Sequence, residues 1–169
     1  KAGELIEPET MVFLGISTIN LEIAKLIYQK NLNITLVTNM IDIMKLFTNE
    51  SSTRLVFLGG SFNRARDGFL GSITIEQIKH YKFDVSFLGV VGIDVYDGKV
   101  TTYEVDDGLT KKEVINCSKK SYIVAQKVKL KQDGNYVFGH IADFTGFIFE
   151  DEIQDNLKER IVRYGLEII

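Results

Sequence analysis

Short apolar runs that alternate with helical patterns are the feature that most constrains the fold of this chain. The apolar runs are typical of buried strands, and they cover residues 11–14, 34–37, 55–58, 85–91, 122–125 and 147–149. Between the runs, apolar residues recur at helical spacing over residues 21–27, 40–47, 73–78, 109–117 and 153–162. Strands that alternate with helices are typical of βαβ units. We therefore predict an α/β fold with a mostly parallel sheet and helices on both faces.

Two further patterns refine this prediction. The run at residues 85–91 is the longest, which favours a place in the middle of a sheet that is covered on both faces. Asp97 and Gly98 form a tight-turn signal between residues 95–96 and 99–100, so we expect a small hairpin there.

Nothing in the chain indicates a domain boundary, because it contains one proline, Pro8, and no linker rich in serine and glycine. We expect a single domain over residues 1–169. A content of 45% hydrophobic and 25% charged residues excludes intrinsic disorder. No apolar run approaches the roughly 20 residues that a membrane-spanning helix needs, and residues 1–4 do not begin a signal sequence. We therefore expect a cytoplasmic protein without a membrane partner.

Metal and nucleotide cofactors have no support in the sequence. Cys117 is the only cysteine, which excludes an internal disulfide and a CxxC zinc site. His80 and His140 lie far apart, and the chain has neither a Walker A nor a GxGxxG pattern. The formal net charge of −3 also argues against nucleic-acid binding by this stretch itself, since phosphate neutralisation needs a basic face.

Small and hydroxyl residues follow three successive predicted strands. Residues 15–18 come after the first, Thr38 and Asn39 after the second, and Gly59 and Gly60 after the third. Loops at the carboxyl ends of parallel strands meet at one edge of the sheet, and the N–H groups of a helix start favour an anion such as phosphate. The alternative is that these residues only cap the helices that follow them.

Charged residues near these loops have two interpretations each. Arg64 and Arg66 could clamp a phosphate by paired hydrogen bonds, or they could be solvated loop charges. Glu104, Asp106 and Asp107 form an acidic cluster. One of these carboxylates could accept hydrogen bonds from sugar hydroxyls or act as a general base, or the two aspartates could simply favour a helix N-terminus.

Lys111 follows Asp107 by four residues on a predicted helix. Its ammonium group could bind a phosphate, which predicts that Lys111→Met weakens ligand binding and leaves stability nearly unchanged. Alternatively, Lys111 pairs with Asp107 at the helix surface, a contact worth about 0.3–0.5 kcal/mol. Lys112 lies about 100° round the helix and is the control for either interpretation.

A series of short motifs runs in order along nearly the whole chain. Its members are Phe13-Leu14, Thr18, Leu21-Glu22-Ile23-Ala24, Val37-Thr38-Asn39, Leu58-Gly59-Gly60, Phe69-Leu70-Gly71, Phe83-Asp84, Phe87-Leu88-Gly89, Gly92-Ile93-Asp94, Thr101-Thr102, Glu104 and Lys111. This ordered series resembles the carboxyl-terminal effector-sensing domain of the DeoR family of bacterial transcriptional regulators.

The resemblance implies a fold related to ribose-5-phosphate isomerase and the CoA transferases, and a pocket that senses a phosphorylated sugar. It also implies operator DNA as a partner, bound through an amino-terminal helix-turn-helix module. Since the chain starts at Lys1, we expect it to be excised from a parent that carries this module. The implied ligand-binding residues are Ser17, Thr18, Thr38, Asn39, Gly59, Gly60 and Lys111 at the phosphate, Thr102, Glu104 and Gly92 at the sugar, and Gly71.

Three positions depart from the family pattern. The first loop reads Gly15-Ile16-Ser17-Thr18-Ile19 where the family usually has Asp-Ser-Gly-Thr-Thr, and its leading glycine is similar to the branch that represses lactose and galactose phosphotransferase operons. Asn63 stands where an arginine usually follows the Gly-Gly pair. The segment Ala125-Gln126-Lys127-Val128-Lys129 lacks the aspartate of the usual Ala-Asp-Ser-Ser-Lys.

The hypothesis that follows is a repressor's sensor domain without catalysis, in which effector binding shifts the equilibrium between DNA-binding states. One alternative is a sugar-phosphate isomerase whose base is Glu104, Asp106 or Asp107. Another is an oligomerisation module with an inactive pocket. We also expect a homo-oligomer, on the abundance of aliphatic and aromatic residues such as Ile141, Phe144 and Phe147.

Overall fold

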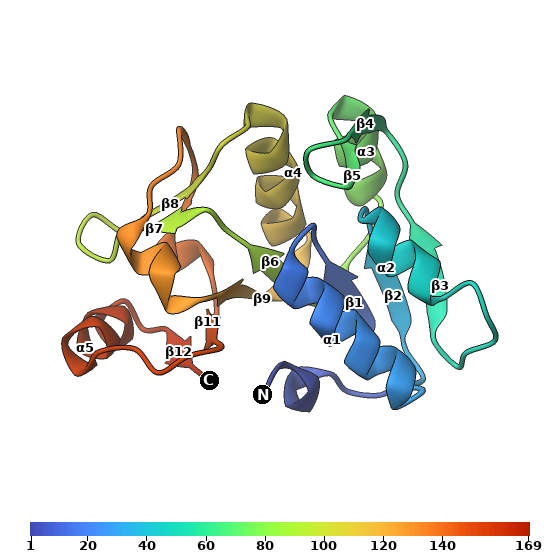
Figure 1. Ribbon diagram of the computed structural model, residues 1–169, viewed down its shortest axis with the longest axis horizontal. Helices are drawn as coiled ribbons and strands as arrows, with labels where there is room; N and C mark the ends of the chain where they lie inside the picture. The colour runs from blue at the N-terminus through green and yellow to red at the C-terminus, as the bar shows by residue number, and fades with distance from the viewer.

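A seven-stranded sheet forms the centre of the molecule in the computed structural model, which describes all 169 residues (Figure 1). In spatial order its strands are β12 (Glu167–Ile168), β11 (Gly146–Phe149), β9 (Ser118–Ala125), β6 (Phe83–Gly89), β1 (Met11–Leu14), β2 (Thr35–Thr38) and β3 (Arg54–Phe57). Every neighbouring pair is parallel. The longest apolar run supplies β6, the central strand, as its pattern predicts.

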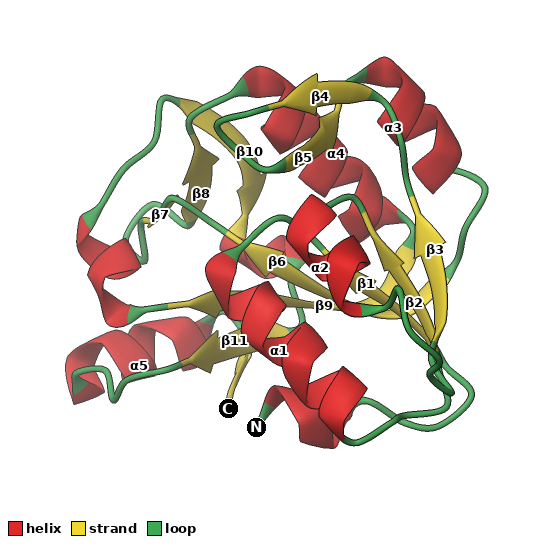
Figure 2. Ribbon diagram, turned by 45° about the vertical axis from the view of Figure 1, so that its right-hand side comes forward, coloured by secondary structure: helices red, strands yellow, loops and turns green.

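Helices cover both faces of this sheet, which confirms the predicted fold class (Figure 2). One face packs against η1 (Ala2–Leu5), α1 (Thr18–Gln29) and α2 (Ile41–Leu46). The other face packs against α3 (Ser72–Ile78), α4 (Val105–Asn116) and α5 (Asp155–Arg163). Because successive strand residues point to opposite faces, Val12 and Leu14 join the α1 side while Phe13 joins the α4 side.

Two smaller units extend from the carboxyl ends of the strands. A three-stranded antiparallel sheet has the order β10 (Tyr136–His140), β8 (Lys99–Thr102) and β7 (Gly92–Ile93). A hairpin consists of β4 (Ser61–Asn63) and β5 (Gly68–Leu70). The short 3-10 helices η2 (Lys127–Lys131) and η3 (Ile141–Asp143) connect the remaining strands.

The predicted hairpin at residues 95–100 is only partly correct. Gly98 adopts a φ of 71°, as the tight turn requires. Residues 95–96 are not a strand, however, because the Asp94 carboxylate accepts hydrogen bonds from the backbone N–H groups of Tyr96 (2.8 Å) and Asp97 (3.1 Å). These bonds use the backbone donors in a local turn, so β8 pairs with β7 instead.

Two further expectations need correction. Helix α4 begins at Val105, four residues before the predicted start, so Asp106 and Asp107 lie in its first turn, where carboxylates favour the positive end of the helix dipole. The residues expected at an oligomer interface, Ile141, Phe144 and Phe147, are 0%, 5% and 0% exposed. They pack in the core between the sheet and the α4 side, so they give no support to an interface, and self-association stays a prediction.

The two termini lie next to each other, with the Lys1 ammonium group 3.2 Å from the carbonyl oxygen of Ile169 (Figure 1). No helix in the chain has both the length and the apolar character that crossing a bilayer requires.

Candidate functional site

A cavity of about 490 Å³ opens at the carboxyl ends of β1, β6 and β9. The chain leaves β1 toward β2 on one side, whereas β6, which pairs with the other side of β1, is reached only later. The cavity therefore lies at the point where the strand order reverses, the place at which ligands bind in open α/β sheets. Its wall is formed by residues 16–19, 21, 40, 42, 65–67, 89–91, 103, 111, 124–126 and 129.

The start of α1 forms one side of the cavity. Ser17 is the N-cap of this helix, and its Oγ accepts a hydrogen bond from the backbone N–H of Asn20 at 3.2 Å. The buried Asn20 side chain donates to the carbonyl oxygens of Gly15 (2.8 Å) and Phe87 (2.9 Å), which ties the loop to β6. A Cβ atom at Gly89 would lie 2.5 Å from that of Ser17, so only glycine allows this close approach.

A buried ion pair lies at the opposite wall, to which it contributes Lys111. The Lys111 Nζ atom contacts the Asp107 carboxylate, and the two side chains are only 8% and 4% exposed. The Thr102 hydroxyl donates to the same carboxylate oxygen, and the Phe138 ring lies 5.6 Å from Nζ. Burial lowers the pKa of Lys111, and the adjacent Asp107 carboxylate opposes that shift. The predicted pairing of Lys111 with Asp107 is confirmed, but its expected place at the surface was wrong, because β8 and β10 cover this side of α4.

Gly108 is what lets the small sheet close over this pair. A Cβ atom there would lie 2.5 Å from the Tyr136 ring and 2.9 Å from the Cβ of Phe138. The missing side chain thus lets β10 pack directly on the first turns of α4, which removes Asp107 and Lys111 from water.

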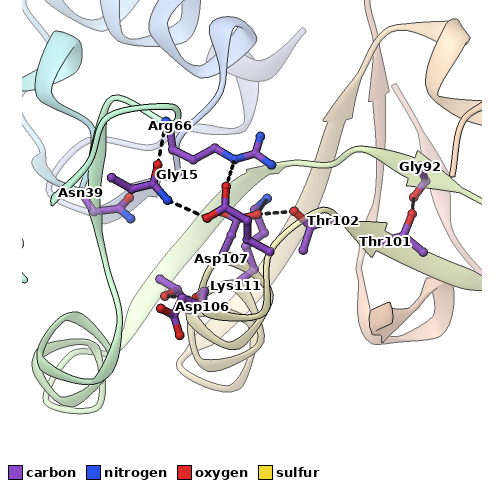
Figure 3. Close-up of polar contacts among 12 residues, drawn as sticks. Gly15, Asn39, Arg66, Gly92, Thr101, Thr102, Asp106, Asp107 and Lys111 are labelled. Atoms are coloured by element: carbon purple, nitrogen blue, oxygen red, sulfur yellow. Dashed lines mark hydrogen bonds and ion pairs between the residues drawn. The ribbon is translucent and has the colours of Figure 1, made fainter. Parts of the chain in front are cut away.

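A second, more exposed group of charges lies at the mouth of the cavity. The Glu104 carboxylate accepts hydrogen bonds from the Asn63 amide (2.6 Å) and from Arg66 Nε (3.3 Å). Arg66 also lies over the Tyr103 ring at 5.5 Å. Figure 3 shows the Arg66 side chain extending from the hairpin toward the group formed by Thr102, Asp107 and Lys111. These bonds connect the β4–β5 hairpin to the start of α4.

The structure brings three of the predicted ligand residues to the cavity wall. They are Ser17, Thr18 and Lys111, and the alternative candidate Arg66 joins them. The wall does not include Thr38, Asn39, Gly59, Gly60, Gly71, Gly92, Thr102 or Glu104. A position at the carboxyl end of a strand is therefore not enough to predict that a residue faces the cavity.

The predicted polar residues that lie off the cavity wall form hydrogen bonds within the protein instead. The buried Thr38 hydroxyl donates to the Leu14 carbonyl (2.7 Å) and accepts from the Met40 N–H (3.1 Å), so it is a turn residue. The Asn39 amide donates to the Phe69 carbonyl at 2.9 Å, while its buried oxygen has no partner. The Thr102 hydroxyl donates to the Asp107 carboxylate, and the Glu104 carboxylate accepts from Asn63 of the hairpin.

The predicted glycines that lie off the cavity wall have structural roles in the backbone. Gly60 has a φ of 152°, and a Cβ there would lie 2.1 Å from the Thr74 hydroxyl oxygen. Gly71 has a φ of 94° and precedes α3. The Gly59 carbonyl accepts from Thr74 and Gln77 of that helix. Gly92 belongs to the small sheet, and Figure 3 shows it with Thr101 away from Lys111.

Several wall residues were not predicted. Asp42 and Asp67 supply carboxylates, and Gln126 and Lys129 follow the end of β9. Lys129 donates to the Gln132 side-chain oxygen at 3.0 Å and forms no ion pair. Gln126 directly follows the carboxyl end of β9, the same kind of position that predicted ligand residues after the first three strands. The two aspartates carried no such signal, since Asp67 lies in a hairpin absent from the prediction.

The cavity is suited to bind an anion that also carries hydroxyl groups. Arg66, Lys111 and Lys129 place three cations on its wall, next to the N–H groups at the start of α1. Asp42 and Asp67 add oxygen acceptors for hydroxyl groups. No cluster of three or more histidine, cysteine or acidic side chains suited to a metal ion is present.

Residues 1–151 match the family described as the DeoR C terminal sensor domain. The chain is 27% identical over 164 residues to a glycerol-3-phosphate regulon repressor of Haemophilus influenzae, covering 95% of this chain and 63% of the relative. It is 24% identical over 168 residues to the HTH-type transcriptional repressor GlcR of Bacillus subtilis, covering 99% of this chain and 64% of the relative.

Among solved structures, ribose 5-phosphate isomerase A of Methanocaldococcus jannaschii superposes with a TM-score of 0.52 at 14% identity. The match covers 76% of this chain and 49% of the isomerase, and it shows a shared fold. This chain spans less than two thirds of the length of the curated relatives that it matches.

Proposed function

Because this chain belongs to the DeoR C-terminal sensor domain family, we propose that its cavity binds a phosphorylated sugar and thereby regulates transcription. The observation that carries the proposal is the cavity at the switch point, with the start of α1 and three cations on its wall. The anion-binding groups suit a phosphate, and the nearby carboxylates and the Gln126 amide suit hydroxyl groups.

The relatives' names support the regulatory part of the proposal. One is named as a repressor of a glycerol-3-phosphate regulon and another as an HTH-type repressor. Residues 1–169 would form a single sensor domain, and a helix-turn-helix module elsewhere in the parent protein would bind operator DNA. A sugar phosphate that binds one domain arrangement tenfold better shifts the equilibrium by about 1.4 kcal/mol.

We place the phosphate near Ser17, Thr18 and Lys129. Ser17 and Thr18 lie where the first N–H groups of α1 are free of intrahelical partners, and Lys129 is the basic wall residue without an ion-pair partner. Isothermal titration of the chain with glucose 6-phosphate and fructose 6-phosphate, and with the corresponding free sugars, tests the proposal. Measurable binding of a phosphorylated form and at least tenfold weaker binding of its free sugar are expected.

A matched pair of variants tests whether the phosphate binds near Lys129. Lys129→Gln removes a cation from the wall and is expected to weaken sugar-phosphate binding about tenfold. Lys127→Gln removes the same charge from an exposed position of η2 outside the wall and is expected to leave binding unchanged. Equal affinity for a sugar and its 6-phosphate would contradict the proposed ligand class.

A sensor domain without catalysis fits the positions of the carboxylates better than an isomerase does. The bases considered for an isomerase, Glu104, Asp106 and Asp107, are all absent from the cavity wall. Glu104 and Asp107 are occupied by hydrogen bonds within the protein. Turnover assays with pentose and hexose phosphates are expected to show no conversion, and conversion that disappears in Glu104→Gln would favour the isomerase. Absence of heat with every sugar phosphate would favour an inactive pocket.

A further inference from the structure

The two ion-paired cations of the cavity wall have their counter-charges on one turn of one helix. Arg66 pairs with Glu104, the N-cap of α4, and Lys111 pairs with Asp107, which lies in the first turn of α4. Without a ligand, both cations are therefore neutralised by carboxylates of the protein. An anion that enters the cavity has to compete with these carboxylates.

The two pairs differ in how easily they can be broken. The Asp107 and Lys111 side chains are 4% and 8% exposed, and Thr102 supplies a third partner. Separating them would leave a buried charge without a partner, which is costly. The Glu104 and Arg66 side chains are 38% and 24% exposed, so water can solvate either one after separation. The outer pair is therefore the one that an entering anion can separate at the lower cost.

We propose that Glu104 is an internal competitor of the ligand: it occupies Arg66 in the free protein, and a phosphorylated ligand displaces it. This inference rests on the proposed function and assigns Glu104 a role in setting affinity. Glu104 does not line the cavity, and its two oxygens are used by Asn63 and Arg66. The role is opposite in sign to that of a sugar-contacting carboxylate, whose removal weakens binding.

Displacement also changes how the hairpin is held. Asn63 and Arg66 both belong to the β4–β5 hairpin, and the Arg66 N–H donates to the Asn63 side chain at 3.2 Å. When Arg66 turns to the ligand, the hairpin keeps its bond from Asn63 to Glu104 and loses its ion pair to α4. Ligand binding thus alters the contact between the hairpin and α4.

The test compares affinities for inorganic phosphate and glucose 6-phosphate in the wild type and in Glu104→Gln, measured by isothermal titration. Glutamine retains the length and the acceptor for Asn63 but removes the charge that competes for Arg66. Binding of both probes is expected to be about three- to tenfold tighter in Glu104→Gln. Glu76→Gln is the control for net charge, because Glu76 forms an exposed ion pair with Lys79 on α3, outside the cavity wall.

A double-variant cycle ties the gain to Arg66. In the Arg66→Gln background, Glu104→Gln is expected to give no gain in affinity, since the cation for which Glu104 and the phosphate compete is absent. The NMR resonance of the Arg66 Nε–H group gives a direct readout: phosphate is expected to shift it in the wild type. A purely structural role of Glu104 would not produce a gain that depends on Arg66.

The outcomes separate this inference from the proposed function. If the wild type binds glucose 6-phosphate and Glu104→Gln binds it equally or more weakly, the competitor role is wrong and the proposed function stands. A gain of the same size in Glu76→Gln would also overturn the role, because net charge would explain it. If neither the wild type nor Glu104→Gln binds either probe, the proposed function fails and this inference fails with it.

Discussion

The start of α4 supplies the carboxylates of two ion pairs that differ in burial. Lys111 and Asp107 lie beneath β8 and β10, whereas Arg66 and Glu104 lie at the cavity mouth with more than a fifth of each side chain exposed. Burial makes the inner pair part of the folded structure, because neither charge can be solvated alone. Exposure leaves the outer pair free to exchange partners at low cost. The comparison predicts that variants of the inner pair change stability and variants of the outer pair change binding.

The largest effect is expected for Lys111→Met. This change leaves the Asp107 carboxylate buried without its cation, and the free energy of unfolding is expected to fall by about 3 kcal/mol, measured by urea denaturation. This reverses the expectation from the sequence alone, which was unchanged stability. Lys112→Met is the control, because Lys112 is exposed and its loss should cost at most about 0.5 kcal/mol. Equal losses in the two variants would remove the distinction between the pairs.

Replacing both members of the inner pair should restore much of that stability. In Lys111→Met with Asp107→Leu, no buried charge remains, and apolar replacements of buried pairs are often tolerated. The Thr102 hydroxyl still loses its acceptor, so a deficit of about 1 kcal/mol relative to the wild type is expected in the same denaturation experiment. If the double variant is no more stable than Lys111→Met, the loss of stability comes from losing the ion pair and not from burying an unpaired Asp107 carboxylate.

The Asp84–Lys119 pair, at the amino end of β6, is more exposed than either pair of α4, but its carboxylate also has a backbone donor. Lys119 lies 2.7 Å from the Asp84 carboxylate, which also accepts from the Met11 N–H, and these bonds lower the pKa of Asp84, Lys119 contributing most. An aspartate whose pKa is lowered by folding stabilises the protein above its unfolded pKa of about 3.9, and that stabilisation is lost as the pH falls through the folded-state pKa.

Asp84→Asn is therefore expected to cost about 1 kcal/mol or less at pH 7, since a third of the Asp84 side chain is exposed and solvent screens the pair. The stability difference between wild type and variant should close as the pH falls below about 4. Thermal denaturation as a function of pH measures this. A difference that persists unchanged to the lowest pH would exclude ionisation of Asp84 as its cause.

The smallest effect on stability is expected for Arg66→Gln. Its pair with Glu104 is partly solvated, so the free energy of unfolding should change by about 0.5 kcal/mol or less. Binding of glucose 6-phosphate should weaken in the same variant, because the cation sought by the ligand is gone. A loss of stability as large as that of Lys111→Met would mean that the outer pair is structural and that the two pairs do not differ in role.

Much of the fold could be predicted because its signals are local. Four-residue apolar runs mark β1, β2 and β3, and the run in β6 correctly indicated the central strand. The Ser17 cap and the turn at Gly98 likewise depend on their immediate neighbours. The β4–β5 hairpin escaped prediction because its strands are three residues long and its conformation depends on contacts with residues distant in the chain, such as the Asn39 carbonyl.

The candidate site was harder to predict, because the same residue types serve ligands and turns. Thr38 and Asn39 do lie at the carboxyl end of β2, yet their side chains donate to the backbone carbonyls of Leu14 in β1 and Phe69 in β5. Lys111 lies on the cavity wall and pairs with Asp107 at helical spacing, but the burial of this pair arises from β8 and β10. Lys129 and Gln126 lie in a segment that departs from the family motif, and their position on the wall follows only from the end of β9.

The sequence by itself determined the alternation of strands and helices, the parallel sheet and the family to which the chain belongs. Those properties follow from periodicity and from ordered motifs, which are read along the chain. The tertiary structure alone decided which polar groups face the cavity and which of two similar ion pairs is removed from water. Burial of a charge depends on the elements that cover it, and the strand that covers Asp107 and Lys111 begins at Tyr136, distant from both in the sequence.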